Sequence, residues 1–570
     1  MVNELTIKIA GEAGQGVQTI GAVLCRVFKK AGLYIYANQD YMSRVRGGNN
    51  FFQLRVSGKP VYCPVKSPDI TVVLNNKSVG LHKPGIANKG VMVLDKTKFA
   101  VSESSKHFFD LPFYELANKT GGSDIYINTV CCGAVIGLMG VGFEYIEGVI
   151  REVFADKGDE IIAKNILAAK NGYDFSRDKF NDGRFKLNKG SAKNTILING
   201  NEAIALGAIK AGCKFYSGYP MTPSTGIMDT VAHFADKFNI VVEQAEDEIA
   251  AINMIIGASF AGVRSMTATS GGGFALMVEG VSLSGMTETP IVVVDAQRPA
   301  PATGFPTRTE QADLNFLIHA GHGEFARIVY SPGTIEEAFY LATKAFNMAE
   351  KYQIPVFIMT DQHLADSLMN IKPFDSNKVE ARRFIISKED SKAVTGYKRY
   401  KLTPPGISPL AVPSWINDVI YADSDEHNEE GHITEDAGLR VKMVEKRLYK
   451  KMAGIAREIE SPVVFNVDKA KTILLGFGST YGVIKEASER LRAKKIGFVH
   501  LPQVWPLPVS KLNLLLRSKK IVTVENNAGA QLAKLLLRET GLKASSSILR
   551  YDGRPFDLDY LIEKIEKLGK

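Results

Sequence analysis

Cysteine is scarce in this sequence. The chain of 570 residues has five cysteines, and no two of them are spaced as Cys-x-x-Cys. Iron–sulfur clusters and structural zinc sites need several closely spaced thiolates, which argues against either group being held by this chain alone. So few thiols in so long a chain also predict a reducing, cytoplasmic location, with most of the thiols buried as small apolar groups. The five are Cys25, Cys63, Cys131, Cys132 and Cys213.

Long apolar runs and segregated charge are also missing. No run reaches the roughly 18 apolar residues of a membrane span, and the first residues lack the charged leader and apolar core of a secretory signal. The net charge is +9, and the basic residues are dispersed, which argues against a nucleic-acid-binding protein. The excess fits anionic small molecules or an acidic partner, although an ordinary soluble surface is the simpler explanation. The length predicts about three or four domains.

The chain is organised around Ser-Gly-Tyr-Pro-Met-Thr-Pro-Ser-Thr at residues 217–225. This stretch follows a strand-like run and precedes a helix-like run from Gly226 to Lys237. Gly218 and Pro220 interrupt the strand, and three hydroxyl side chains come beside the free N–H groups of the helix start. Such a turn can bind a small anion, because the N–H groups and the helix dipole both face it. A capped helix after a tight turn is an equally good interpretation of these residues alone.

Three further features are expected beside that turn. Residues 191–375 alternate strand-like and helix-like runs, which predicts a parallel, doubly wound sheet. Glu-Asp-Glu at 246–248, a glycine run at 271–273 and Gln-Arg at 297–298 each follow a strand-like run. Because the carboxyl ends of parallel strands meet at one edge of a sheet, where ligands bind, we expect these groups to converge there.

These segments resemble the motifs of a known family. The 217–225 run is very similar to the Tyr-Pro-Ile-Thr-Pro-Ser-Ser/Thr motif of the 2-oxoacid:ferredoxin oxidoreductases, with Met221 in place of isoleucine. Further matches follow in order: Glu-Asp-Glu at 246–248, Thr-Ser-Gly-Gly-Gly at 269–273, Gly-Phe-Pro-Thr-Arg-Thr-Glu-Gln at 304–311, and Asp-Glu-His at 425–427 with Gly-His-Ile-Thr-Glu at 431–435. The whole chain is therefore identified as similar to the alpha subunit of that family, with a gamma-type domain fused at its N-terminus.

The resemblance implies three α/β domains. They are a gamma-type domain over residues 1–190, a thiamine-diphosphate-binding domain of the pyrimidine type over 191–375, and a transketolase C-terminal-like domain over 461–570. Residues 376–460 are expected to form a linker and a helix. That helix is predicted to be amphipathic and packed on a core, because apolar residues recur at helical spacing at positions 441, 444, 448, 452, 455 and 459.

The resemblance also implies roles for particular residues. Glu248 matches the glutamate that hydrogen-bonds N1′ of thiamine diphosphate and activates the cofactor, with Glu246 as the alternate. Arg298 matches the position that clamps the 2-oxoacid, and Thr222 is expected to hydrogen-bond the carboxylate or oxo group of the substrate. Without the resemblance, an acidic turn that satisfies the helix dipole explains Glu248 better. The other expected cofactor contacts are Tyr219, Pro220, Ser270 and Gly271.

A second arginine, Arg308, lies in the 304–311 motif. A guanidinium binds a carboxylate through two parallel hydrogen bonds, so Arg298 and Arg308 compete for the substrate carboxylate. Two cationic sites suit a dicarboxylate, which favours 2-oxoglutarate over pyruvate or a branched-chain 2-oxoacid. A salt bridge of Arg308 with Glu310 or Asp313 explains this arginine without a substrate.

A glycine turn opens the chain. Gly-Glu-Ala-Gly-Gln-Gly at 11–16 lies between a strand-like run and a helix-like run from Val17 to Lys30, which is the order of a phosphate-binding loop. The spacing is not Gly-x-Gly-x-x-Gly, so a close helix–strand packing turn is at least as good an interpretation. The family resemblance makes Gly14, Gly16 and Arg46 candidates to face an anion such as coenzyme A.

The chain also lacks part of what the family's chemistry needs. Thiamine enzymes bind Mg²⁺ and the diphosphate through Gly-Asp-Gly followed by Asn-Asn, and here Asn526-Asn527 has no Gly-Asp-Gly before it. No metal site is expected on this chain. The resemblance therefore implies an alpha subunit whose beta subunit carries Mg²⁺, the diphosphate end of the thiamine diphosphate and an iron–sulfur cluster, in a dimer of heterodimers.

The implied reaction is the reversible, coenzyme A-dependent oxidative decarboxylation of a 2-oxoacid. It gives acyl-CoA and CO₂, and the electrons pass to ferredoxin. Two other classes fit some of the residues. One is a non-catalytic scaffold that binds coenzyme A or a nucleotide and docks a catalytic partner, and the other is a thiamine-dependent transketolase-type transferase.

Overall fold

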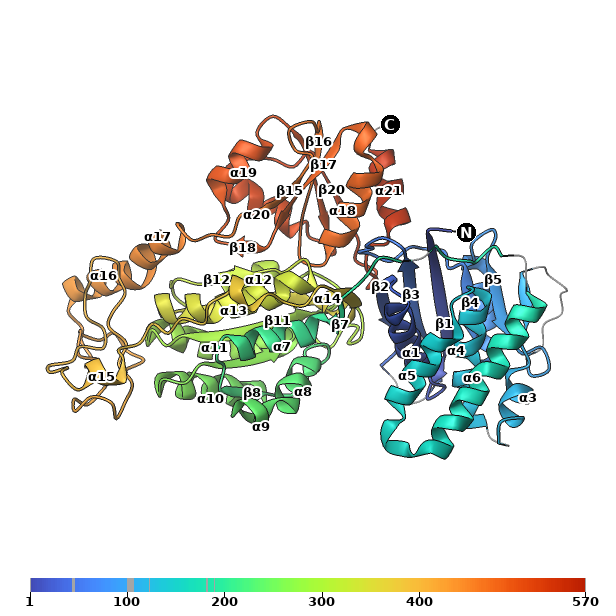
Figure 1. Ribbon diagram of the computed structural model, residues 1–570. Helices are drawn as coiled ribbons and strands as arrows, with labels where there is room; N and C mark the ends of the chain where they lie inside the picture. The colour runs from blue at the N-terminus through green and yellow to red at the C-terminus, as the bar shows by residue number, and fades with distance from the viewer. Residues whose placement is uncertain are drawn as a thin grey trace. The chain divides into compact units, whose positions relative to one another are not determined.

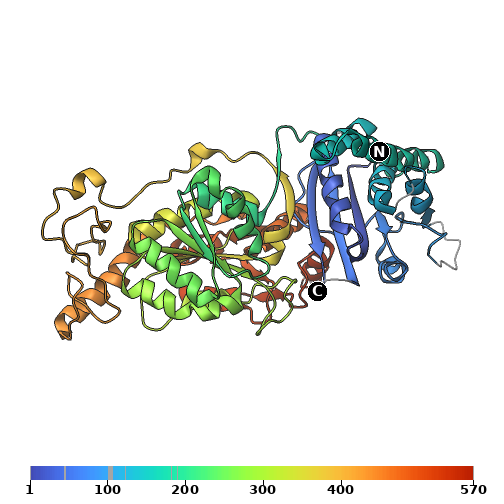
Figure 2. The same cartoon turned by 90° about the horizontal axis from the view of Figure 1, so that it is seen from below.

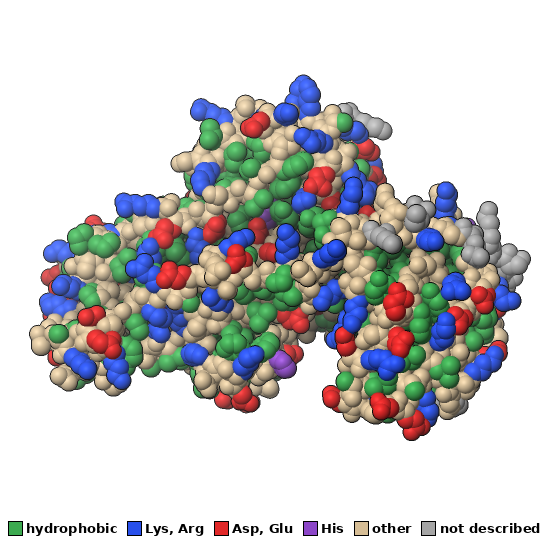
Figure 3. Space-filling view, viewed as in Figure 1, with side chains coloured by type: hydrophobic (Ala, Val, Ile, Leu, Met, Phe, Trp, Pro, Cys, Tyr) green, Lys and Arg blue, Asp and Glu red, His purple; other side chains and the backbone are tan. Residues whose placement is uncertain are grey.

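The chain folds into two compact units. The computed structural model describes residues 2–43, 47–99, 107–121, 124–180, 183–188 and 190–568. None of the helices in this described part combines the length and apolarity of a membrane span. On the face drawn in Figure 3, acidic and basic side chains are interspersed. The N-terminal unit comprises Met1–Ile198, Ser367–Pro373 and Phe556–Lys570, and the main unit comprises Asn199–Asp366 and Phe374–Pro555.

An eight-stranded sheet forms the N-terminal unit (Figure 1). In sheet order its strands are β6 (Phe108–Asp110), β5 (Val91–Leu94), β4 (Ile70–Val73), β1 (Glu4–Ala13), β3 (Gly47–Ser57), β2 (Tyr34–Asp40), β14 (Leu368–Ile371) and β7 (Ile196–Asn199). Its helices are α1 (Val17–Lys30), α2 (Asn76–His82), α3 (Phe113–Asn118), α4 (Ile127–Leu138), α5 (Phe143–Val153), α6 (Asp159–Lys179) and α21 (Leu558–Lys567), with short 3-10 turns at Lys83–Gly85, Asp124–Tyr126 and Ala155–Lys157. Helices α1, α4, α5 and α6 pack against one another beside the sheet (Figure 2).

A seven-stranded sheet forms the first half of the main unit. In sheet order its strands are β18 (Gln503–Trp505), β12 (Ile328–Tyr330), β13 (Pro355–Asp361), β11 (Ile291–Gln297), β10 (Ser265–Thr269), β8 (Phe215–Gly218) and β9 (Val241–Gln244). All neighbours are parallel except β12 and β18. The helices are α7 (Gly200–Lys210), α8 (Thr225–His233), α9 (Ala235–Phe238), α10 (Glu248–Phe260), α11 (Gly271–Met286), α12 (Leu314–His319), α13 (Ile335–Tyr352) and α14 (Gln362–Asp366). The predicted parallel, doubly wound sheet is confirmed.

A five-stranded sheet forms the other half of the main unit. In sheet order its strands are β15 (Val463–Phe465), β17 (Ile496–Leu501), β16 (Thr472–Phe477), β19 (Lys520–Glu525) and β20 (Ser546–Leu549). Its helices are α18 (Thr480–Arg490), α19 (Val509–Leu516) and α20 (Gln531–Thr540), with a 3-10 turn at Arg492–Lys494. Residues 472–555 are called the C-terminal domain below. This domain is joined to the seven-stranded sheet in two ways. It contributes β18 as the edge strand of that sheet. The two also share one continuous apolar core, in which Ile252, Phe274 and Phe357 lie with Leu475 and Leu535.

The segment between the two sheets corrects one expectation. Besides α15 (Lys388–Ser391) and a 3-10 turn at Ser376–Lys378, it forms α16 (Ala437–Glu445), a π-helical turn at Lys446–Lys450 and α17 (Lys451–Ile455). The amphipathic helix predicted from the apolar spacing is only partly right about the face that is buried. Ile455 is buried as expected, whereas Val441 is exposed and Lys446 and Lys451 are buried.

A buried carboxylate explains why the two lysines turn inward. Glu288 is completely buried, and both lysines pair with it, Lys451 through an Nζ to Oε2 distance of 2.5 Å. Burial alone would raise the pKa of Glu288, and the ammonium groups of Lys446 and Lys451 bring it below its usual range. Burial lowers the pKa of Lys451 to about 7. An unpaired buried charge is costly, so the pairing decides which face of the helix turns inward.

Candidate functional site

The carboxyl ends of the parallel strands meet at one edge of the seven-stranded sheet. Thr269 at the end of β10 lies opposite Asp295 of β11, and Gln297 at the end of β11 lies opposite Asp361 of β13. The turn after β8, the start of α11 and Arg298 therefore follow neighbouring strand ends. This is the arrangement that places ligand-binding groups side by side in α/β sheets.

Glu248 is a buried carboxylate at the start of α10. Its side chain is 3% exposed, whereas Glu246, the alternate, is exposed. The cap of α10 is Asp247, whose Oδ1 accepts the N–H of Ala250 at 2.7 Å. Asp247 is thus the side-chain cap, and Glu248 lies in the first turn of α10, where a carboxylate also interacts favourably with the helix dipole. Among the residues that the structure describes, nothing hydrogen-bonds the buried Oε1 of Glu248.

Glycine is required where α11 approaches this carboxylate. A Cβ atom at Gly273 would lie 2.5 Å from Oε1 of Glu248 and 2.0 Å from Oγ1 of Thr269. A Cβ atom at Gly271 would lie 2.4 Å from Oδ2 of Asp313. At distances this short, a side chain at either position would force the neighbouring side chains to move. The glycine run thus lets the start of α11 lie between two buried carboxyl groups.

The 217–225 turn is tied to the same helix start. Ser270 is the fully buried N-cap residue of α11, and its Oγ donates to Sδ of Met221 at 2.7 Å. Of the other expected cofactor contacts, Pro220 is half-buried and Tyr219 is 42% exposed. The methionine that replaces the family's isoleucine therefore packs directly on a residue predicted to bind the cofactor.

Thr222 and Arg298 are in direct contact. Nη1 of Arg298 donates to the main-chain oxygen of Thr222 at 2.7 Å. The Thr222–Pro223 peptide bond is cis, and α8 begins at Thr225. Arg298 is half-buried, and burial lowers the pKa of its guanidinium. Two residues predicted to bind the substrate thus come together from two different strand ends.

Arg308 is held by another part of the main unit. It lies on the 305–311 loop, which packs against the C-terminal domain. A Cβ atom at Gly553 would lie 3.3 Å from Cβ of Arg308, and the N–H of Thr309 donates to the oxygen of Gly553 at 3.4 Å. Gln311 at the end of the loop bonds to Asn526, as described below. The loop also contacts the edge of the seven-stranded sheet, because Oγ1 of Thr309 donates to Oδ1 of Asp361, at the end of β13, at 3.4 Å.

Two buried carboxyl groups were missed as site residues. Asp295 is completely buried, and neither of its carboxylate oxygens has a hydrogen-bond partner in the described part of the chain. Burial and the nearby Asp313 raise the pKa of Asp295 well above its usual range. Burial raises the pKa of Asp313 to about 6, and burial with the charge of Asp313 raises the pKa of Glu310 to about 7. The sequence did contain a signal for Asp295, because a charged residue follows the apolar run Ile-Val-Val-Val directly.

The glycine turn of the N-terminal unit lines a cavity of about 400 Å³. Gly14, at φ +91, has open space where a side chain would begin. Gly16, at φ +79, is the close-packed position, because a Cβ atom there would lie 1.9 Å from Nδ2 of Asn128. The two interpretations of this turn therefore apply to different glycines. Arg46, the third residue expected to face coenzyme A, lies outside the described residues.

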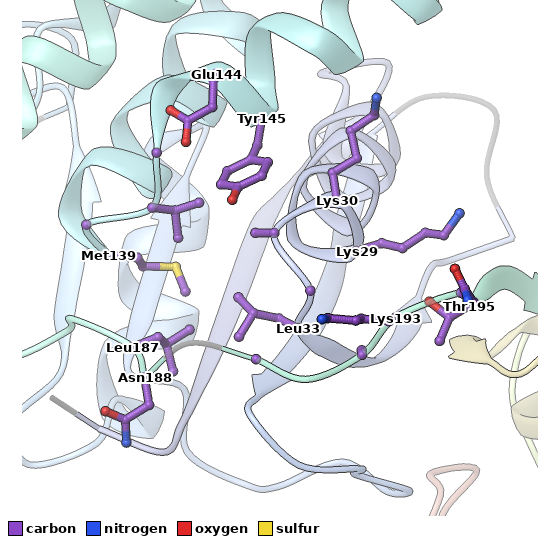
Figure 4. A pocket seen from close by; sticks show the side chains of 18 residues that line it. Lys29, Lys30, Leu33, Met139, Glu144, Tyr145, Leu187, Asn188, Lys193 and Thr195 are labelled. Carbon is purple, nitrogen blue, oxygen red and sulfur yellow. The ribbon is translucent and has the colours of Figure 1, made fainter.

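A second cavity of about 880 Å³ lies in the same unit, between the end of α1, the start of α5 and residues 187–188 and 190–195 (Figure 4). Tyr145, Lys29 and Lys193 are among its lining residues. None of the predicted site residues lines it. The described residues also contain no group of three or more His, Cys, Asp or Glu side chains placed to hold a metal ion.

Three family profiles match the chain in order. Residues 6–175 match the family described as "Pyruvate ferredoxin/flavodoxin oxidoreductase". Residues 206–446 match "Pyruvate flavodoxin/ferredoxin oxidoreductase, thiamine diP-bdg", which covers the strand ends, Glu248 and both arginines. Residues 470–558 match "Pyruvate:ferredoxin oxidoreductase core domain II".

Relatives match over the whole length. A 2-oxoacid:ferredoxin oxidoreductase subunit alpha from Sulfolobus sp is 34% identical and aligns with 99% of this chain and 96% of its own. The chain belongs to the 2-oxoacid:ferredoxin oxidoreductase family. A 2-oxoglutarate synthase subunit KorA from Methanocaldococcus jannaschii is 36% identical over 58% of this chain and 88% of its own. The solved 2-oxoglutarate:ferredoxin oxidoreductase from Magnetococcus marinus, with 2-oxoglutarate, coenzyme A and succinyl-CoA bound, covers 100% of both chains at a TM-score of 0.93 and 31% identity.

As a 2-oxoacid:ferredoxin oxidoreductase alpha subunit, the chain is part of a multisubunit oxidoreductase, which confirms the predicted class of enzyme. The α/β fold with a domain of the thiamine-diphosphate-binding type is confirmed as well. The domain boundaries and the roles of individual residues remain predictions.

Proposed function

We propose that this alpha subunit completes a thiamine diphosphate site together with a beta subunit. The enzyme then converts a 2-oxoacid, coenzyme A and oxidised ferredoxin reversibly to acyl-CoA, CO₂ and reduced ferredoxin. One observation carries the proposal. Glu248 is buried at the strand-end edge, and its Oε1 lacks a hydrogen-bond partner among the described residues. A buried polar group without a partner is expensive, which supports a ligand as its missing partner.

The residues around Glu248 fit the aminopyrimidine end of thiamine diphosphate. Glu248 would hold a proton between its carboxylate and the ring nitrogen N1′, and Ser270 and Gly271 would border the ring at the start of α11. Tyr219 and Pro220 would border it from the turn after β8. The cofactor, when bound, supplies the nucleophilic carbon and the electron sink for decarboxylation. This chain supplies the buried carboxylate and the shape of the pocket.

Arg298 and Thr222 would bind the carboxylate next to the oxo group of the substrate. The half-buried guanidinium is already oriented by the main-chain oxygen of Thr222. Arg308 would bind a second carboxylate, which favours 2-oxoglutarate. Relatives named 2-oxoglutarate synthase and the solved relative with bound 2-oxoglutarate support this choice. Pyruvate and branched-chain 2-oxoacids are the alternative substrates.

Coenzyme A would enter as the second substrate. The cavity beside Gly14 and Gly16 is the candidate for one of its phosphate groups, with Arg46 as the expected charge partner. A glycine turn between a strand and a helix presents backbone N–H groups to a phosphate. The solved relative with coenzyme A bound supports coenzyme A as the acyl acceptor.

An uncovered apolar face supports a partner subunit. Helices α10 and α11 are apolar on nearly all sides, yet Ile249, Met254 and Leu276 are 50%, 39% and 51% exposed. A helix that is apolar all round is normally buried, so a partner is expected to cover this face beside Glu248. We assign this face to a beta subunit that carries Mg²⁺, the diphosphate and an iron–sulfur cluster and passes electrons to ferredoxin. The proposal also includes a dimer of heterodimers, a cytoplasmic location and domains at 1–190, 191–375, 376–460 and 461–570.

The decisive experiment is an anaerobic activity assay of the chain co-expressed with its beta subunit. Thiamine diphosphate, Mg²⁺, coenzyme A and a panel of 2-oxoacids are added, and reduction of a viologen dye is followed. Reduction that needs both chains and a 2-oxoacid is the expected result, with 2-oxoglutarate as the best substrate. A stable complex that reduces no dye with any 2-oxoacid would contradict the proposal and favour the scaffold or the transketolase-type transferase. Of these two, transfer of a two-carbon unit without dye reduction would identify the transferase.

A further inference from the structure

Gln311 joins the 305–311 loop to the C-terminal domain through hydrogen bonds. Its side chain is completely buried. Its main-chain N–H donates to the oxygen of Asn526 at 2.7 Å, and its Oε1 accepts the N–H of Asn526 at 3.1 Å. Its main-chain oxygen accepts Nδ2 of Asn527 at 3.1 Å, and its Nε2 donates to the oxygen of Phe477 at 3.0 Å. The C-terminal domain thus bonds to both main-chain groups and both side-chain groups, and Nε2 also donates to Oδ2 of Asp361 of β13 at 3.4 Å.

The two asparagines are themselves fixed within that domain. Asn526 donates through Nδ2 to the oxygens of Arg550 at 2.6 Å and Arg554 at 3.3 Å. Asn527 donates through Nδ2 to Glu525 at 3.1 Å. The Asn-Asn pair, which lacks the Gly-Asp-Gly of a diphosphate site, therefore has a different use. It joins the 550–554 turn to the end of the loop that carries Arg308.

The same turn touches the loop a second time. Gly553 has φ +74, and a Cβ atom there would lie 3.0 Å from Cδ2 of Phe305 and 3.3 Å from Cβ of Arg308. Its oxygen accepts the N–H of Thr309 at 3.4 Å. The loop is thus held by the C-terminal domain both at Arg308 and at its end.

We propose that the C-terminal domain sets substrate specificity by fixing the 305–311 loop, with Gln311 as the positioning residue and Arg308 as the group that meets the second carboxylate of the substrate. This inference rests on the proposed function, in which Arg308 binds that carboxylate. A guanidinium that must meet a carboxylate through two hydrogen bonds needs a fixed backbone beneath it. Loosening the loop should therefore weaken the binding of dicarboxylic 2-oxoacids and spare monocarboxylic ones, which Arg298 alone binds.

The test compares KM and kcat of the alpha–beta complex for 2-oxoglutarate and for 2-oxobutyrate. In Gln311→Met, we expect KM for 2-oxoglutarate to rise about tenfold, equivalent to about 1.4 kcal/mol. We expect kcat and both constants for 2-oxobutyrate to stay within about twofold. Gly553→Ala should act in the same direction from the other contact. Equal losses for the two substrates, or no change for either, would overturn the inference.

Gln531→Met is the matched control. Gln531 also joins the two halves of the main unit, because its Nε2 donates to the oxygen of Ala312 at 2.6 Å and its Oε1 accepts the N–H of Asn315 at 2.9 Å. These bonds lie beyond the loop. A loss of KM selectivity in this variant as large as that in Gln311→Met would show a general weakening of the interface and overturn the inference.

A double variant tests whether Gln311 acts through Arg308. If it does, Gln311→Met with Arg308→Met should raise KM for 2-oxoglutarate no further than Arg308→Met alone, whereas independent effects would add. An additive result overturns the inference.

The substrate range of the wild-type complex distinguishes a failure of the proposed function from a failure of this inference. A complex that is inactive with every 2-oxoacid contradicts the proposed function. One that uses only monocarboxylic 2-oxoacids contradicts the inference and the preference for 2-oxoglutarate, and leaves the proposed type of reaction standing.

Discussion

The two arginines of the candidate site are positioned in different ways. Arg298 directly follows β11, and the turn after β8 orients it through the oxygen of Thr222. Arg308 lies on a loop that contacts Asp361 of β13 and is also held by residues more than two hundred positions further along the chain, such as Asn526. The first region is built by the register of one parallel sheet, and the second depends on a separate domain as well.

This difference separates chemistry from selectivity. Groups at strand ends share the rigidity of the sheet, which suits a carboxylate that must meet a cofactor and an arginine that meets the part common to every 2-oxoacid. A loop held by another domain can change without disturbing those groups. We therefore expect changes at the strand ends to affect every substrate, and changes at the loop to affect one class.

The largest effect is expected at Glu248. Glu248→Gln keeps the size of the side chain but removes its ability to exchange a proton, so kcat should fall by about 10² to 10⁴ for every 2-oxoacid. Assembly with the beta subunit, measured by size-exclusion chromatography, should be unchanged. Normal dye reduction by the variant complex would contradict the role of Glu248 in activating the cofactor. Glu246→Gln is the control, and it should retain activity.

Replacement of each arginine sharpens the comparison. Arg298→Lys loses the planar fork at the strand end, so KM should rise about tenfold for 2-oxoglutarate and 2-oxobutyrate alike. Arg308→Lys should raise KM for 2-oxoglutarate only. Steady-state kinetics of both variants with both substrates would refute the division if Arg298→Lys proved selective for one substrate.

Crowding at the glycine run should affect stability as well as activity. In Gly273→Ala the new methyl group meets Glu248 and Thr269 at less than contact distance, so the free energy of unfolding should fall by about 1–3 kcal/mol. Gly272→Ala is the matched control, because the oxygen of Ala302, 3.8 Å away, is what its Cβ atom would meet. Urea unfolding of both purified variants makes the measurement, and equal losses would contradict the close approach of α11 to Glu248.

The smallest effect concerns the pH dependence of stability. Burial raises the pKa of Asp313 from 3.8 to about 6, so the folded protein binds this proton more tightly than the unfolded chain. The free energy of unfolding should therefore fall as pH rises from about 4 through 6, and Asp313→Asn should remove that decline. The Tm of the variant relative to wild type should be higher at pH 8 than at pH 5. An identical difference at both pH values would count against the raised pKa.

Much of the site could be predicted from the sequence. The strand and helix periods of residues 191–375 place Thr222, Glu248, the 271–273 glycines and Arg298 after successive strands, and parallel pairing then brings them to one edge. The helix at Val17–Lys30 was predicted to the residue. These features follow from local stereochemistry, because strand ends and helix starts depend on residues close in the chain.

Other features could not be predicted, because they depend on distant pairings. Nothing near Lys446 in the sequence indicates that it turns inward to meet Glu288, 158 residues away. The carboxyl groups of Asp295 and Asp313 are ordinary acidic residues until the sheet and α12 bury them together. Burial and long-range charge pairing are properties of the packed molecule.

The sequence by itself determined the α/β architecture, the family and the order of the groups along one sheet edge, because periodicity and turn chemistry act over a few residues. Only the tertiary structure decided that Oε1 of Glu248 is buried without a hydrogen-bond partner among the described residues, and that Gln311 is held by Asn526 and Asn527. The reason is physical. Hydrogen bonds in a packed interior must be satisfied by whichever groups the fold brings near, and the fold brings together residues that the sequence keeps far apart.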